Sequence, residues 1–144
     1  MTYEFSVIGI PKGSPRPRAF TRGKHASVFV PPQADDWKSC VRAAVRLATF
    51  DDPPMLDGPV RLSIIYRLPR PKSSKKRDRT PWHITKPDLD NMDKATMDAL
   101  SEAGVWNDDR QVAFKESSKV YADVGEAVGA SIVVIELSPQ KGST

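Results

Sequence analysis

The side chains best suited to chemistry are the carboxylates concentrated between Asp88 and Asp109. This stretch holds seven acidic residues and one basic residue, Lys94, whereas the whole chain carries a net charge of +4. Crowded carboxylates repel one another and raise each other's pKa unless a cation compensates. Mg²⁺ suits this role because it binds one or two carboxylates together with substrate phosphates. The pattern therefore indicates metal-assisted chemistry on a nucleic acid.

The same acids could instead cap a helix or bind calcium. A carboxylate at a helix start can accept hydrogen bonds from free N–H groups, but capping explains only one of Asp88 and Asp90. An EF-hand loop counted from Asp88 fails, because Asp93 stands at the sixth position in place of Gly and Ala99 at the twelfth in place of Glu. Spacing alone leaves a magnesium site and a capped helix as open alternatives.

Lys94 follows Asp90 by four residues, so the two side chains share one face of a predicted helix. An ordinary salt bridge at this spacing contributes less than about 0.5 kcal/mol. Beside a bound phosphate, the same ammonium group would instead stabilise negative charge in the transition state. The sequence is compatible with both roles.

Two basic segments accompany the acidic stretch. Residues 1–34 and 67–86 contain thirteen of the 22 basic residues and two of the 18 acidic ones. Such clusters are typical of proteins that bind the phosphate backbone, although a solvated loop has the same composition. The residues predicted to contact DNA are Lys12, Arg16, Arg18, Arg22, Lys24, Lys72, Lys75, Lys76, Arg77, Arg79 and Lys86. Trp82 and His83 could either stack on a base or fix the loop that carries them.

The elements that must position these residues follow from periodicity. Apolar residues at helical spacing predict helices over 33–49 and from Leu89 to a stop at Gly104. Alternation or apolar runs predict strands over 3–10, 60–68, 111–121 and 130–137. Basic loops are expected over 11–31, with a short strand at 28–30, and over 69–87. A hairpin loop is expected at 123–129 and a flexible tail after Ser138. The prediction is an α+β fold, a single domain over residues 1–144, with a mixed sheet of about four strands against two helices.

Composition excludes several classes of protein. The single cysteine, Cys40, rules out an internal disulfide and is expected to fill space in the core. No apolar stretch approaches the roughly 20 residues that cross a bilayer, and the N-terminus does not resemble a signal peptide. We therefore expect a cytoplasmic protein with no membrane partner and no organic cofactor.

The segment from Lys86 to Val112 resembles the RusA family of Holliday-junction resolvases. The resemblance rests on Lys-Pro-Asp-Leu-Asp-Asn at 86–91, then Lys94, Asp98-Ala99-Leu100, Gly104 and Asn-Asp-Asp-Arg-Gln-Val at 107–112. The loop Pro-Lys-Gly-Ser-Pro-Arg-Pro-Arg at 11–18 is similar to the N-terminal region of that family.

The resemblance implies a small homodimeric, Mg²⁺-dependent endonuclease, with Mn²⁺ as a possible substitute, of the kind that phages and prophages often encode. Such enzymes cut four-way DNA junctions by paired symmetric nicks in recombination and repair. The resemblance makes Asp88, Asp90 and Asp109 the metal-binding carboxylates and Lys94 the essential basic residue, with Asp108 a less certain partner. Two alternatives stay open: a Mg²⁺ nuclease that acts on flaps or forks, and a DNA-binding protein without catalytic activity.

Overall fold

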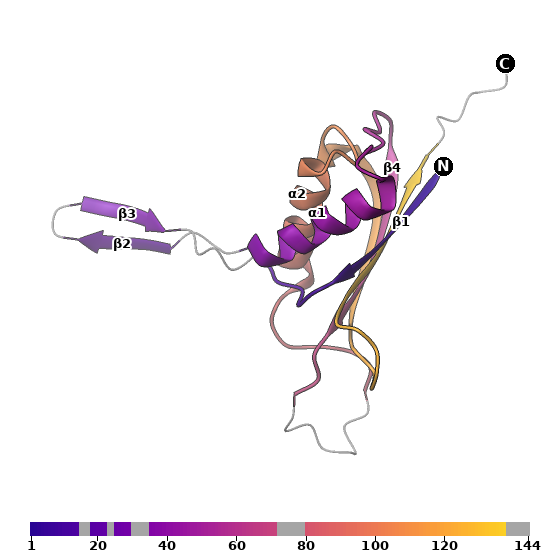
Figure 1. Ribbon diagram of the computed structural model, residues 1–144. Helices are drawn as coiled ribbons and strands as arrows, with labels where there is room; N and C mark the ends of the chain where they lie inside the picture. Colours follow the sequence, from indigo (N-terminus) through magenta and orange to yellow (C-terminus); the bar gives the residue numbers. More distant parts are fainter. Residues whose placement is uncertain (15–17, 23–24, 30–34, 72–79, 138–144) are drawn as a thin grey trace.

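The computed structural model describes residues 1–14, 18–22, 25–29, 35–71 and 80–137. Its main body is a four-stranded sheet with two helices (Figure 1). In chain order the elements are β1 (Thr2–Ile8), β2 (Arg18–Arg22), β3 (His25–Phe29), α1 (Asp35–Thr49), β4 (Val60–Leu68), α2 (Leu89–Glu102), the 3-10 helix η2 (Asp109–Gln111), β5 (Val112–Tyr121) and β6 (Gly129–Glu136). The predicted α+β fold with a mixed sheet is confirmed.

The strand order places the functional segments inside one crossover unit. The sheet runs β1-β6-β4-β5, with β6 antiparallel to both β1 and β4, and β4 parallel to β5. Parallel neighbours need a long connection, and α2 forms part of it here. The acidic stretch from Asp88 to Asp109 lies within this β4–α2–β5 unit.

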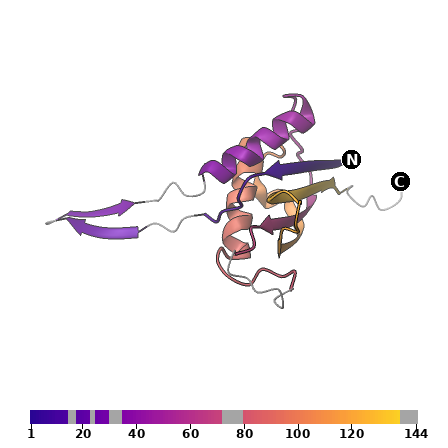
Figure 2. The same cartoon turned by 60° about the horizontal axis from the view of Figure 1, so that its bottom comes forward.

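The core lies between the sheet and the two helices. Both views show α1 and α2 on the same face of the sheet (Figures 1 and 2). Strand β4 alternates as predicted and directs five residues into the core, each at most 3% exposed: Val60, Leu62, Ile64, Tyr66 and Leu68. Helix α2 buries Met92, Ala95, Thr96, Ala99 and Leu100 on the predicted face.

The C-terminus of α2 also agrees with the sequence. Ala103 caps the helix, and Gly104 follows with a φ of +84°, a conformation that glycine adopts without steric cost. A Cβ atom at this position would lie 3.0 Å from Met55 Sδ and 3.1 Å from Pro53 Cγ. Gly104 thus lets the chain turn closely against residues 53–55.

Two expectations are wrong, the loop over most of 11–31 and the hairpin loop at 123–129. The short strand expected at 28–30 is confirmed in part, because β3 covers 28–29. Residues 18–29 contain the antiparallel hairpin β2–β3, which pairs Arg18 with Phe29 and Arg22 with His25. This hairpin projects from the body in both views (Figures 1 and 2). The prolines that indicate a loop here lie before and after the two strands in the sequence and not within them.

The connection at 123–129 is not a hairpin loop, because β4 lies between β5 and β6 in the sheet. The basic run at 72–79 and the tail from Ser138 lie outside the described residues.

Candidate active site

The first candidate carboxylate, Asp88, stands at the N-terminus of α2. Its backbone is extended, with φ −73° and ψ 147°, and its side chain makes no capping hydrogen bond. Its carbonyl oxygen accepts from the N–H of Met92 at 3.1 Å and so begins the helix. Asp88 and Asp90 are both exposed. Helix capping therefore does not account for the Asp88 carboxylate.

Lys119 of β5 fixes the segment that leads into α2. Its Nζ donates to the carbonyl oxygens of Thr85 at 2.6 Å and Pro87 at 2.8 Å. The N–H of His83 donates to the carbonyl oxygen of Lys119 at 3.1 Å. The polypeptide before Asp88 is thereby attached to the edge strand of the sheet.

The N-terminal loop supports the same place from the other side. The N–H of Ser14 donates to the carbonyl oxygen of Asn91 at 2.9 Å. A Cβ atom added to Gly13 would lie 2.8 Å from Asn91 Cβ, so this approach requires glycine. The first turn of α2 is thus held between the loop at 11–14 and the segment at 85–87.

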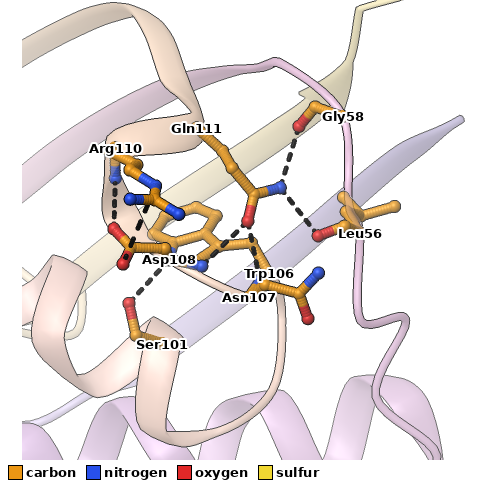
Figure 3. A network of polar contacts seen from close by, with 8 residues as sticks. All are labelled: Leu56, Gly58, Ser101, Trp106, Asn107, Asp108, Arg110 and Gln111. Atoms are coloured by element: carbon orange, nitrogen blue, oxygen red, sulfur yellow. Dashed lines mark hydrogen bonds and ion pairs between the residues drawn. The ribbon is translucent and has the colours of Figure 1, made fainter.

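The second pair of carboxylates follows the end of α2. Asp108 Oδ1 accepts from the N–H of Arg110 at 2.9 Å, and Gln111 Oε1 accepts from the N–H of Asp108 at 2.8 Å, which is a capping box around η2 (Figure 3). Gln111 Nε2 donates to the carbonyl oxygens of Leu56 at 2.7 Å and Gly58 at 2.9 Å. This network sets the backbone that carries Asp109.

The charges near Asp109 distinguish it from Asp108. Partial desolvation, a side-chain hydrogen bond with Asp108 and the charges of Asp108 and Asp98 raise the pKa of Asp109. The Arg110 N–H holds the pKa of Asp108 below its ordinary value. The Asp108 carboxylate is therefore engaged by the backbone N–H of Arg110, whereas partial desolvation and neighbouring carboxylates disfavour the charged form of Asp109, an effect that a bound cation would oppose.

The acidic groups at the two ends of α2 are separate within the protomer. Asp109 lies near Asp98, and Asp90 precedes Asp98 by eight residues, a rise of about 12 Å along a helix. Carboxylate oxygens suit a hard divalent ion. However, no group of three or more His, Cys, Asp or Glu side chains in the described part of the chain is arranged to hold a metal ion. The described part of the protomer therefore supplies suitable ligands without gathering them at one point.

One member of the acidic stretch, Asp93, is buried. Its carboxylate accepts from Tyr66 Oη at 2.7 Å and Ser117 Oγ at 2.8 Å, and Lys115 Nζ lies 3.1 Å away. The side chain is 3% exposed. Burial and the Asp93 charge raise the pKa of Tyr66 well above its ordinary value. Asp93 thus joins α2 to β4 and β5 as part of the fold.

Comparison with known proteins assigns the chain to a family. The model of the family described as "Endodeoxyribonuclease RusA" matches residues 9–132. The chain belongs to the RusA family. A relative from Bacillus subtilis (strain 168), named "Uncharacterized protein YqaN", is 30% identical over 128 residues, which cover 83% of this chain and 88% of that protein. Family membership supports nuclease activity on branched DNA junctions, with a general dependence on divalent metal ions.

Basic residues that bind DNA are expected in a RusA-family protein, and two of the predicted ones line the same cavity. Lys12 and Lys86 line one cavity beside the start of α2. Arg18 and Arg22 lie on β2 of the projecting hairpin. The other seven predicted DNA contacts, Arg16, Lys24, Lys72, Lys75, Lys76, Arg77 and Arg79, lie outside the described residues. Among the described residues, no helix is long and apolar enough to cross a membrane.

Asp98 is the site candidate that the sequence prediction omitted. Its negative charge contributes to the raised pKa of Asp109. The signal in the sequence was its position four residues after Lys94, which places the two side chains on one helix face. The exposed Lys94 lies on α2 between Asp90 and Asp98.

Proposed function

We propose that this RusA-family protein resolves Holliday junctions as a Mg²⁺-dependent endodeoxyribonuclease that makes paired symmetric nicks in DNA recombination and repair. The observation that carries the proposal is the exposed Asp88 carboxylate, which makes no capping hydrogen bond although Lys119 and the Gly13 loop fix its surroundings. A positioned carboxylate that does not cap its helix is available to a cation. Mn²⁺, which also prefers oxygen ligands, is expected to substitute.

The residues have distinct proposed roles. Asp88, Asp90 and Asp109 would hold the ion, which when bound supplies Lewis-acid stabilisation of the charge developing on the phosphate. Lys94, exposed on α2 four residues after Asp90, would place its ammonium beside the same phosphate. Lys12 and Lys86 would bind the neighbouring backbone phosphates.

The separation of Asp88 and Asp90 from Asp109 favours a homodimeric active site. In a two-fold dimer, each contact between the protomers occurs twice. If the start of α2 in one protomer lies against Asp109 of its partner, the dimer therefore contains two such sites. Two such sites would provide the two nicks that a four-way junction requires. We infer that dimer formation completes the ligand set that one protomer leaves divided.

A panel of DNA substrates tests this function. The full chain is incubated with a four-way junction, a fork, a flap and a linear duplex, each with Mg²⁺ or with a chelator. We expect symmetric nicks in the junction that require Mg²⁺. Cleavage restricted to flaps or forks would indicate another branched-DNA nuclease. Binding without cleavage of any substrate would indicate a non-catalytic DNA-binding protein.

A further inference from the structure

A cavity of about 490 Å³ opens beside the N-terminus of α2. Its apolar wall includes Ile10, Leu68, Pro69 and Pro87, and Lys12 and Lys86 contribute positive charge. No acidic side chain is among its described lining residues. The volume lies within the roughly 300–1,000 Å³ typical of ligand pockets. An apolar interior with two cations suits a flat aromatic ligand that carries a phosphate.

The walls of this cavity are fixed by contacts to the rest of the fold. Lys119 binds the carbonyl oxygen of Pro87 at 2.8 Å on one side. On the other side Gly13 packs against Asn91, and the N–H of Ser14 binds the Asn91 carbonyl oxygen at 2.9 Å. The cavity is therefore formed before any ligand binds, which lowers the entropic cost of binding.

His83 contributes a largely buried imidazole to the wall. The residue lines the cavity and is 7% exposed, and its Nδ1 is inaccessible to solvent and has no hydrogen-bond partner among the described residues. The other ring nitrogen, Nε2, lies 3.3 Å from Thr85 Oγ1.

The position of the cavity connects it with the DNA strand. Pro87 lines the cavity, and the next residue is Asp88, the first proposed metal ligand. A nucleotide bound here would therefore lie beside the phosphate to be cut. Extruding a base from the stack costs least when its stacking or pairing is already disturbed. At the exchange point of a four-way junction, successive bases of the exchanging strand belong to different arms and do not stack on one another.

We propose that this cavity binds one unstacked nucleotide of the junction, with its base against Ile10, Leu68 and Pro69 and its phosphate near Lys12 and Lys86. This inference rests on the proposed junction-cleaving function and adds a base-binding step beside the cut. It explains why an apolar cavity with a fixed wall lies next to a site for a highly charged backbone.

The first test uses only the parent protein. A four-way junction with 2-aminopurine at the exchange point is bound in Ca²⁺, which is expected to support binding without cleavage. Because stacking quenches this fluorescent base, we expect its emission to rise on binding at the exchange point and not two base pairs into an arm. Equal emission from free and bound junction would overturn the inference.

A variant that fills the cavity supplies the second test. Ile10 is 56% exposed and lines the cavity, so Ile10→Trp should fold while occluding it; Ile8→Trp, at a 75% exposed position outside the cavity lining, is the matched control. We expect Ile10→Trp to abolish the emission rise and to slow junction cleavage by at least about tenfold, as misplacement of the reacting phosphate does. Affinity for linear duplex should stay unchanged, and Ile8→Trp should behave like the parent.

The outcomes separate the two proposals. If the parent cuts no junction in Mg²⁺, the proposed function fails. If the parent cuts the junction but Ile10→Trp shows parental emission and rate, only the nucleotide cavity is contradicted. Circular dichroism of both variants establishes that each is folded before its rate is compared.

Discussion

Lys94 is the residue whose catalytic and structural roles differ most in their consequences. If Lys94 only forms a surface salt bridge with Asp90 or Asp98, its replacement by Ala should change the free energy of unfolding by less than about 0.5 kcal/mol. A group that stabilises the transition state should instead slow cleavage by roughly 10²-fold or more. We expect Lys94→Ala to show the second result with unchanged junction affinity, and Lys94→Arg to rescue it only in part.

The measurement for Lys94 is single-turnover cleavage of a four-way junction at saturating Mg²⁺, together with a gel shift in Ca²⁺. Cleavage by Lys94→Ala at the parental rate would return this residue to the solvated surface of the helix.

Asp93 leads to a prediction about stability. Replacing it by Ala leaves Tyr66, Ser117 and Lys115 without their shared acceptor. We expect Asp93→Ala to lower the free energy of unfolding by about 1–3 kcal/mol, because buried polar groups lose a hydrogen bond. The exposed Asp90→Ala is the matched control and should stay within about 0.5 kcal/mol. Equal urea midpoints for the two variants would show that the Asp93 network does not stabilise the fold.

The residue roles differ in how far the sequence could reveal them. Asp93 follows Leu89 by four residues and precedes Thr96 by three, so its spacing alone predicts a place on the buried face of α2. A charged residue is nevertheless not expected to be buried. The partners that make its burial possible, Tyr66 and Ser117, lie on strands far from Asp93 in the sequence, so they could not be identified from it. The proximity of Asp98 and Asp109 depends on the turn after Gly104, which spacing does not specify.

At the scale of elements, the segment before α2 depends on Lys119. Removing its ammonium frees the carbonyl groups of Thr85 and Pro87 and allows Asp88 to shift. We expect Lys119→Met to slow cleavage by up to about 10²-fold through misplacement, with junction affinity unchanged. Lys119→Arg should rescue part of the rate.

Lys38→Met is the matched control for Lys119, because it removes an ion pair with Glu102 toward the opposite end of α2. The same single-turnover assay compares the three variants. If Lys119→Met and Lys38→Met cut equally fast, Lys119 does not position the site.

The same segment predicts a dependence of stability on pH. Burial and the charge of Lys119 lower the pKa of His83 from 6.5 in the folded protein. The unfolded chain therefore binds more protons as the pH falls through 6.5, and stability is lost in that range. We expect His83→Gln to lose less stability than the parent between about pH 7.5 and pH 5.5. Superimposable curves of unfolding free energy against pH would contradict this expectation.

Elements with a clear period were predictable, and their pairing was not. Strand β4 shows period-two alternation from Val60 to Leu68 that only the exposed Ile65 interrupts, and α2 shows an apolar face and a glycine stop. The hairpin β2–β3 consists of two five-residue strands between prolines, and neither strand has a clear alternation of apolar and polar residues. The order β6-β4-β5 reflects long-range packing, because β4 occupies the place where a local hairpin would have formed.

At the scale of the whole molecule, charge and symmetry act together. Under the proposed function, the basic segments would attract the phosphate backbone, and the acidic stretch has carboxylates toward both ends of α2. A dimer that joins these ends would become active only after assembly. Only the dimer would then cleave DNA, and it has two active sites for the two strands of a junction.

The most direct measurement is strand nicking by mixed dimers. Asp88→Asn and Asp109→Asn chains with different tags are co-expressed, purified through both tags, and assayed on a four-way junction in Mg²⁺. Each variant alone should be inactive. If the partner's Asp109 completes the site, the mixed dimer contains one site with all its carboxylates and one site that lacks two, so we predict a single nick per junction. An inactive mixed dimer would place all the ligands of each site within one protomer, and parental nicking by either variant alone would remove that aspartate from the site.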